Sequence, residues 1–184
     1  MDATVGVLAL QGDFEAHAKP LHSLGAKVRE VRTPADLDGV GALVLPGGES
    51  TTITLGIERE GLAKPLREFA ASGAPMLGTC AGMIVLDREH LGILDLRAER
   101  NAFGRQVHSF EADVELRGFD GPLRGVFIRA PWIAEHGPDV ELLGSIDGRP
   151  IAARRGSILA VAFHPELAGE LRLHAWLLER LRLR

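Results

Sequence analysis

The chain has 184 residues, of which 46% are hydrophobic and 25% charged, and its formal net charge is −4. This length predicts one domain covering residues 1–184, and the composition is that of an ordered globular protein. The charge gives no basic footprint for nucleic acid. No apolar run approaches the roughly 20 residues of a transmembrane helix, and no signal peptide is visible. Because its single cysteine fits a reducing compartment, we expect a cytoplasmic protein without membrane contact.

The first part of the chain alternates apolar runs with helical patterns. The runs 5–10 and 41–45 are typical of strands buried on both faces of a parallel sheet, and residues 26–31 predict a second strand between them. Between the first two strands, residues 14–24 carry apolar side chains at helical spacing, with Asp13 placed to cap the helix and Gly25 to end it. The repeated order of strand, helix and strand predicts an α/β fold with a doubly wound, mostly parallel central sheet and flanking helices.

A glycine-rich loop, 46–51, follows the third strand and opens a helix. It lacks the lysine of a P-loop and the spacing of a dinucleotide-binding loop, so phosphate binding is disfavoured. Gly47 and Gly48 permit a turn with backbone N–H groups at the carboxyl end of a strand, where α/β proteins place their ligands. An oxyanion donor could lie here. On these residues alone, a plain turn with Ser50 as the helix N-cap is an equally good interpretation.

A helix over 61–72 leads to the short apolar run 74–82, which ends in Gly78-x-Cys80-x-Gly82 and passes into a helical pattern expected to end near residues 90–92. This is the sequence motif of a nucleophile elbow, with cysteine in place of serine. A cysteine at that turn sits at a helix N-terminus, which favours the nucleophilic thiolate. The alternative is a small buried hydrophobic side chain, since free cysteine is among the most buried residue types.

The pattern changes after Leu94. Alternation over 107–114 predicts half-exposed, antiparallel strands that form a small extension of the fold. Arg100 and Arg129 lie in this region, and the planar fork of an arginine is suited to holding a carboxylate. Taken singly, each arginine is more typical of a solvated surface.

The last part of the chain predicts three strands, 140–145, 150–153 and 158–163, and an amphipathic C-terminal helix with its apolar face at Leu167, Leu171, Ala175, Leu178 and Leu181. The third strand ends in His164-Pro165-Glu166. Residues two apart in extended chain point to the same side, so Glu166 could hold His164 as a general base requires. Without the cysteine elbow, a surface His and Glu at a strand end would be the better interpretation.

Together these signals are far more specific than each one alone, and the chain resembles the triad-type (class I) glutamine amidotransferases. Within them it is most similar to the glutaminase subunits of pyridoxal 5′-phosphate synthases. The segments that carry this resemblance run from end to end of the chain: 6–12, 45–52, 78–82, 99–107, 126–131 and 163–167. One departure is a short connection at 88–93, where many members of the family have a longer loop.

The resemblance implies a role for each matching position. Cys80 would attack the glutamine carboxamide, His164 would transfer the proton, and Glu166 would orient His164. The backbone N–H groups of Gly48 and Ala81 would stabilise the oxyanion. The positions matching those that hold glutamine are Gly47, Gly48, Glu49, Arg100, Ile128 and Arg129, with Gln11 beside the same pocket.

The implied reaction converts glutamine and water to glutamate and ammonia through a γ-glutamyl thioester, with no metal and no cofactor. Ammonia would pass to a (β/α)₈-barrel synthase subunit in a hetero-oligomeric complex. Two other classes remain open on the sequence. One is a catalytically silent subunit of the same fold, and the other is a different cysteine hydrolase of γ-glutamyl amides that needs no partner.

Overall fold

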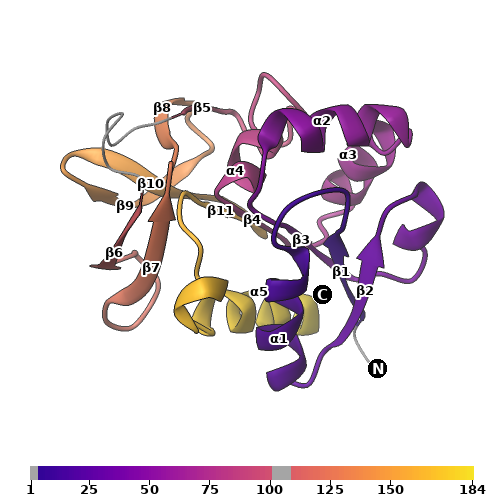
Figure 1. Ribbon diagram of the computed structural model, residues 1–184, viewed down its shortest axis with the longest axis horizontal. Coiled ribbons are helices and arrows are strands. Elements are labelled where there is room, and N and C mark those ends of the chain that lie inside the picture. Colours follow the sequence, from indigo (N-terminus) through magenta and orange to yellow (C-terminus); the bar gives the residue numbers. More distant parts are fainter. Residues whose placement is uncertain (1–3, 101–108) are drawn as a thin grey trace.

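Seven strands form the central sheet of the computed structural model, which describes residues 4–100 and 109–184 (Figure 1). They are β1 (Thr4–Leu8), β2 (Lys27–Val31), β3 (Ala42–Leu45), β4 (Met76–Thr79), β9 (Glu141–Ile146), β10 (Arg149–Arg155) and β11 (Ile158–Val161). The order across the sheet is β2-β1-β3-β4-β11-β10-β9. The first five strands are parallel, and β10 and β9 continue the sheet in antiparallel fashion.

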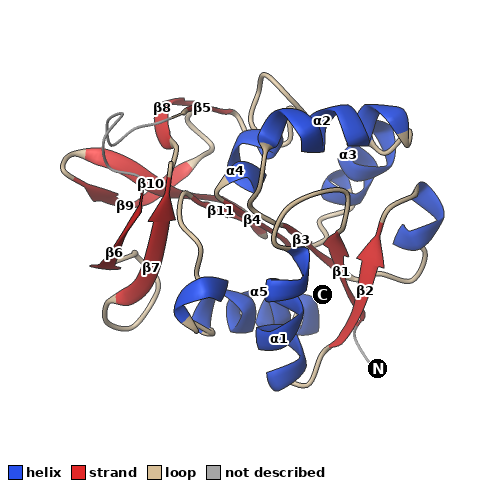
Figure 2. Cartoon of the chain, in the orientation of Figure 1, coloured by secondary structure: helices blue, strands red, loops and turns tan. Residues whose placement is uncertain are grey.

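Helices cover both faces of this sheet (Figure 2). They are α1 (Phe14–Ser23), α2 (Ser50–Arg59), α3 (Ala63–Ala71), α4 (Ala81–Leu86) and α5 (Arg172–Arg182). Helices α1 and α5 pack on one face, while α2, α3 and α4 lie on the other. The predicted doubly wound, mostly parallel sheet is therefore confirmed. In the part of the chain that the structure describes, no helix is long and apolar enough to cross a membrane.

Two small antiparallel pairs extend the fold on the side of β9 and β10 (Figure 1). Strand β5 (Leu96–Glu99) pairs with β8 (Trp132–His136), and β6 (Ser109–Val114) pairs with β7 (Leu123–Ile128). The half-exposed, antiparallel character predicted for this region is confirmed. Residues 101–108 lie outside the described part of the chain, and with them most of the segment 99–107 that contributes to the family resemblance.

The strands nearest the middle of the sheet are buried along their whole length. Every residue of β3, β4 and β11 is buried, as the continuous apolar runs in the sequence indicate for strands covered by helices on both faces. Each fully buried Leu, Ile, Val or Met side chain contributes roughly 1.5–3 kcal/mol by leaving water. Because these strands are parallel neighbours, their carboxyl ends come out at one edge of the sheet.

Helix α4 is shorter than predicted, because it ends at Leu86 instead of continuing to residues 90–92. The fully buried Asp87 ends it. Its carboxylate accepts hydrogen bonds from the backbone N–H groups of Glu89, His90 and Ala98. The same carboxylate lies 2.7 Å from Nδ1 of His90. Tertiary contacts therefore fold residues 87–92 into a turn and tie it to β5, where the local sequence pattern would have allowed a longer helix.

The predicted apolar face of the C-terminal helix is partly wrong. Leu167 and Leu171 precede α5 and are 45% and 40% exposed. Gly169 adopts a left-handed conformation (φ 68°) that separates them from the helix. Helix α5 buries Leu178, as predicted, together with Leu173, Trp176 and Leu177. At the start of α1, Asp13 occupies the N-cap position, as predicted, but its side chain makes no capping hydrogen bond.

Close packing of α4 on the sheet requires glycine at position 82. A β-carbon at Gly82 would lie 2.1 Å from the backbone oxygen of Leu45, which cannot move without disturbing β3. We therefore expect Gly82→Ala to lower the free energy of unfolding by roughly 1–3 kcal/mol, as overpacking does. Urea denaturation measures this. Gly56→Ala is the matched control, because its β-carbon would meet only the Leu10 side chain, at 3.3 Å. Equal stability of the two variants would contradict the prediction.

Candidate active site

Four neighbouring strands deliver the candidate site residues to one edge of the sheet. The segments after β1, β3, β4 and β11 carry, in that order, Gln11, Gly47, Cys80 and His164. This edge is where open α/β sheets bind their ligands, close to the point at which the strand order reverses. The fold thus brings together residues that are separated by more than 150 positions in the sequence.

Cys80 occupies the turn between β4 and α4 in a strained conformation, with φ 50° and ψ −108°. Its backbone N–H donates to the carbonyl of Val161 at 2.8 Å, which fixes the turn against β11. The side chain is 7% exposed, and Sγ lies 3.8 Å from the carbonyl oxygen of Ile128. A β-carbon at Gly78 would lie 2.9 Å from the backbone oxygen of Gly82, so both flanking glycines serve close packing. The geometry is that of the predicted elbow.

The His164 ring and the Glu166 carboxylate meet, with Nδ1 and Oε1 2.7 Å apart. The predicted geometry behind this contact is wrong, however. Pro165 has helical dihedral angles (φ −68°, ψ −33°), and Glu166 begins a short 3₁₀ helix, η2 (Glu166–Ala168), so the segment is not extended. The turn brings the carboxylate back to the ring. His164 itself is held by its backbone N–H, which donates to the carbonyl of Val126 at 2.8 Å.

The surroundings of His164 favour its protonated form. Burial of the ring opposes protonation, but hydrogen bonding with Cys80 and Glu166, together with their charges, outweighs it and raises the pKa of His164 to about 10. Asp13 adds a third acidic group, with Oδ2 3.9 Å from Nδ1. An imidazolium paired with a thiolate is the arrangement that activates a cysteine nucleophile and supplies a proton to a leaving group.

The glycine loop is braced by the turn that follows β1. The backbone N–H of Asp13 donates to the carbonyl of Gly47 at 3.1 Å, and the N–H of Glu49 donates to Oε1 of Gln11 at 2.7 Å. Gly48 has φ 147°, which a residue with a side chain rarely adopts. The resemblance assigns Gly47 to the glutamine pocket and Gln11 to its margin. In the structure both residues brace this loop, and neither is among the residues that line the pocket.

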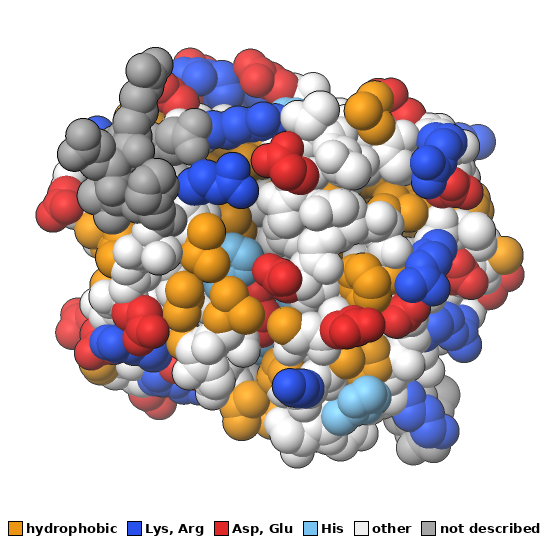
Figure 3. All heavy atoms as spheres, in the orientation of Figure 1, with side chains coloured by type: hydrophobic (Ala, Val, Ile, Leu, Met, Phe, Trp, Pro, Cys, Tyr) orange, Lys and Arg blue, Asp and Glu red, His pale blue; other side chains and the backbone are white. Residues whose placement is uncertain are grey.

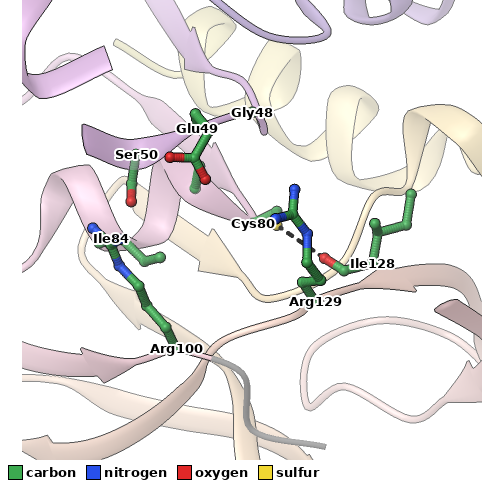
Figure 4. Close-up of a pocket in the computed structure, with 9 residues that line it drawn as sticks. Gly48, Glu49, Ser50, Cys80, Ile84, Arg100, Ile128 and Arg129 are labelled. Atoms are coloured by element: carbon green, nitrogen blue, oxygen red, sulfur yellow. Dashed lines mark hydrogen bonds between the residues drawn. The ribbon is translucent and has the colours of Figure 1, made fainter. Parts of the chain in front are cut away.

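A pocket of about 120 Å³ opens above Cys80 (Figure 4). Its walls are formed by Gly48, Glu49, Ser50, Cys80, Ala81, Ile84, Arg100, Ile128 and Arg129. Glu49 and the two arginines come from opposite sides of the pocket (Figure 4). Arg100 approaches Thr51 Oγ1 at 3.3 Å, and Arg129 has a positive φ of 44° directly after β7. The structure thus gathers seven of the residues that the sequence predicts for one site.

Buried polar residues beneath this site escape the sequence analysis. His17, Thr79 and His174 are all 0% exposed. Burial lowers the pKa of His17 well below its usual value and that of His174 to about 4, so both rings are neutral at pH 7. The one available signal is a histidine at an apolar position of the first helix, which predicts burial but not its partners.

Comparison with solved structures defines the class of this protein. A crystal structure of a glutamine amidotransferase superposes with a TM-score of 0.91 at 45% identity, over 96% of this chain and 98% of that one. The fold is that of the class I glutamine amidotransferases. The chain belongs to the SNO glutamine amidotransferase family, whose sequence profile matches residues 7–183. A second glutamine amidotransferase, from Thermotoga maritima, is 16% identical over 96% of this chain and 83% of its own, and with a TM-score of 0.64 it shares the fold alone.

Curated relatives match nearly the whole chain. A protein of Acidothermus cellulolyticus is 53% identical, over 94% of this chain and 90% of its own length. A Deinococcus radiodurans protein is 51% identical, over 93% of each chain, and one from Mycobacteroides abscessus is 47% identical, over 99% of each. All three are named pyridoxal 5′-phosphate synthase subunit PdxT.

Gly47 is packed against the His164 ring so closely that a β-carbon there would lie 2.3 Å from Cε1. We therefore expect Gly47→Ala to displace the ring and to lower glutamine turnover roughly 10²-fold, as a misplacement of about 1 Å does. Turnover is measured as glutamate release, and thermal denaturation shows whether the fold is kept. Gly56→Ala is again the control and should keep full turnover. An unimpaired Gly47→Ala enzyme would show that this contact does not set the position of the ring.

Proposed function

We propose that this glutamine amidotransferase hydrolyses L-glutamine to L-glutamate and ammonia, and that it supplies the ammonia to a synthase subunit that makes pyridoxal 5′-phosphate. The observation that carries the proposal is the small pocket above Cys80, with His164 beside the thiol and Glu166 bonded to His164. Family membership supports the amidotransferase activity, and the names of the relatives support the choice of product.

In this proposal Cys80 is the nucleophile. Its thiolate attacks the carboxamide carbon of glutamine, and the resulting tetrahedral oxyanion is stabilised by the backbone N–H groups of Ala81 and Gly48. His164, as imidazolium, donates a proton to the departing nitrogen. Ammonia is released, and the γ-glutamyl group remains bound to Cys80 as a thioester. His164 then removes a proton from water, which attacks the thioester and releases glutamate. Glu166 keeps the ring oriented and stabilises its positive charge.

The charges around the pocket suit a free amino acid. Arg100 and Arg129 can hold the α-carboxylate, since the guanidinium group presents paired donors to carboxylate oxygens. Glu49, on the opposite side, complements the α-ammonium group. Ile84 and Ile128 offer apolar surface to the methylene groups of the substrate. This set of groups recognises both ends of glutamine and places its carboxamide at the thiol.

Two features support a partner that docks near the site. Apolar side chains gather over η2 on the face shown in Figure 3, where Leu167 and Leu171 are partly exposed. The glycine loop, whose Gly48 N–H is the proposed oxyanion donor, is braced by the turn after β1 through hydrogen bonds with Asp13 and Gln11. A partner covering this face could shift the loop between an inactive and a competent state, according to its affinity for each. In the inactive state the Gly47–Gly48 peptide would be flipped and the hydrogen bond from Asp13 lost.

The triad assignment predicts an order of effects. Cys80→Ala should remove glutaminase activity from a folded protein, and His164→Asn should cost nearly as much. Glu166→Gln should cost less, because the orienting carboxylate contributes least on its own. Glutamate release in the presence of the synthase subunit measures all three. Substantial turnover by Cys80→Ala would refute the nucleophile, while a Glu166→Gln enzyme slower than His164→Asn would refute the roles within the pair. Faster release from γ-glutamyl peptides than from glutamine would point to a different hydrolase.

If the partner shifts the glycine loop from its inactive to its competent state, glutaminase activity should depend on the partner. Losing one oxyanion donor costs roughly 10²–10³ in turnover, so we expect the isolated chain to be slower than the complex by a factor of that order. The measurement is turnover at saturating glutamine with and without the synthase subunit. Equal rates would mean that the loop is competent in the free chain, and gating would be abandoned even if the triad assignment holds.

A further inference from the structure

The second oxygen of the Glu166 carboxylate lies in an unusual environment. Oε1 is paired with His164, but Oε2 is fully buried and has no hydrogen bond of ordinary geometry within the described part of the chain. A buried carboxylate oxygen without a donor is costly. The group that faces it is His17, whose Nε2 lies 3.5 Å from Oε2, with both side chains 0% exposed.

His17 connects Glu166 to the interior of the protein. Nε2 also lies 3.1 Å from Oγ1 of Thr79, the residue before Cys80, and Nδ1 lies 2.8 Å from Nε2 of His174 on α5. The two imidazole rings are tilted by 50°, with their centroids 5.1 Å apart. A continuous row of polar groups therefore runs from α5 through α1 to the carboxylate beside His164.

The titratable groups along this row set its protonation. Glu166 faces His164 and His17, and His164 also faces Cys80 and Asp13. His17 faces His174, and the positive charge of the nearby His164 contributes to lowering the pKa of His17. His174 faces His17 and Glu170, whose backbone and negative charge both act to raise the pKa of His174 but do not outweigh its burial. Because His17 and His174 are buried and neutral, each ring carries one proton, and the protons can take one of two arrangements.

In the first arrangement, His17 carries its proton on Nε2, facing Glu166, and His174 donates from Nε2 to Nδ1 of His17. In the second, both protons point the other way, toward the backbone of Glu170. In the first arrangement the Nε2–H is shared between Thr79 Oγ1 at 3.1 Å and Oε2 of Glu166 at 3.5 Å. In the second, the bare Nε2 accepts from the Thr79 hydroxyl and turns its lone pair toward the carboxylate. Because a lone pair opposite a buried carboxylate leaves that carboxylate without a donor, the first arrangement is favoured.

We infer that His17 is a positioning residue, which donates through its Nε2–H to Glu166 and thereby fixes the carboxylate that orients His164. This inference rests on the proposed function. The separation of 3.5 Å is long for a hydrogen bond, as is common for catalytic contacts before substrate binds. By sharing the negative charge of Glu166, His17 also limits how tightly the carboxylate holds the imidazolium, which must give up its proton during turnover.

The tautomer is tested directly by ¹⁵N NMR of the imidazole nitrogens in the intact chain, since protonated and bare nitrogens are readily distinguished. We expect Nε2 of His17 to carry the proton and Nδ1 to be bare at pH 7. A bare Nε2 would overturn the inference, because a lone pair facing the carboxylate cannot hold it.

Two substitutions separate positioning from packing. His17→Gln keeps an amide N–H near the place of Nε2, while His17→Met fills similar space without a donor. We expect His17→Met to lower kcat in the complex roughly tenfold, at the low end of the 10–100-fold typical for outer-shell partners of metal ligands, with KM unchanged because His17 does not line the pocket. His17→Gln should restore most of this loss. Equal losses in the two variants would overturn the inference.

The pKa of His164 supplies a readout that a merely structural role would not move. Without His17, the charge of Glu166 is less shared, so the carboxylate stabilises the imidazolium more and the pKa of His164 should rise above its value in the unmodified chain. Histidine titration by NMR in His17→Met measures this. His174→Met is the matched control, because it removes an equally buried ring that does not face Glu166, and it should shift the pKa less.

Failure of this inference can be told from failure of the triad. If Glu166→Gln lowers the pKa of His164 while His17→Met leaves it unchanged, the triad stands and the role of His17 is refuted. If Glu166→Gln itself leaves the pKa of His164 unchanged, the pairing on which both proposals depend is refuted.

Discussion

The close approach of helix α4 to the sheet is the constraint on which the site depends. Gly82 packs against the backbone of Leu45, and Gly78 packs against Gly82, so the chain turns sharply enough to hold Cys80 at φ 50°. A strained backbone conformation with positive φ at a residue with a side chain persists only where the surroundings enforce it. Here the hydrogen bond from the Cys80 N–H to Val161 and the fully buried strands on either side of β4, β3 and β11, impose this conformation.

Contacts between backbone segments hold the rest of the site to this turn. Gly47 touches the His164 ring, Gly12 touches the carbonyl of Gly47, and the turn carrying Gln11 and Asp13 bonds the same loop. Because several of these contacts involve main-chain atoms, they leave little room for side-chain variation. The pocket walls are different, since Arg100 and Arg129 directly follow β5 and β7, which lie outside the central sheet. The positions of these two arginines therefore depend on how the antiparallel pairs pack against that sheet.

Below the pocket, burial and ion pairing determine which histidines are charged. The imidazolium of His164 lies between a thiol and a carboxylate, and its pKa of about 10 reflects both. The two neutral histidines beneath it have lowered pKa values because burial disfavours their charged forms. The charged pair, His164 and Glu166, therefore lies closest to the pocket, and the neutral rings of His17 and His174 lie farther inside the protein.

The sequence by itself determined the alternation of strands and helices, the elbow at Cys80 and the glycine loop, because each depends on local periodicity or on residues that only a few backbone conformations accept. It also placed His164 beside Glu166, although by an extended geometry that the turn at Pro165 replaces. Only the tertiary structure decided where α4 ends, which leucines α5 buries, and that His17 meets Glu166. These features depend on partners distant in the chain, such as Asp87 bonding Ala98 or His17 meeting His174, and a hydrogen bond across the fold leaves no periodic trace in the sequence.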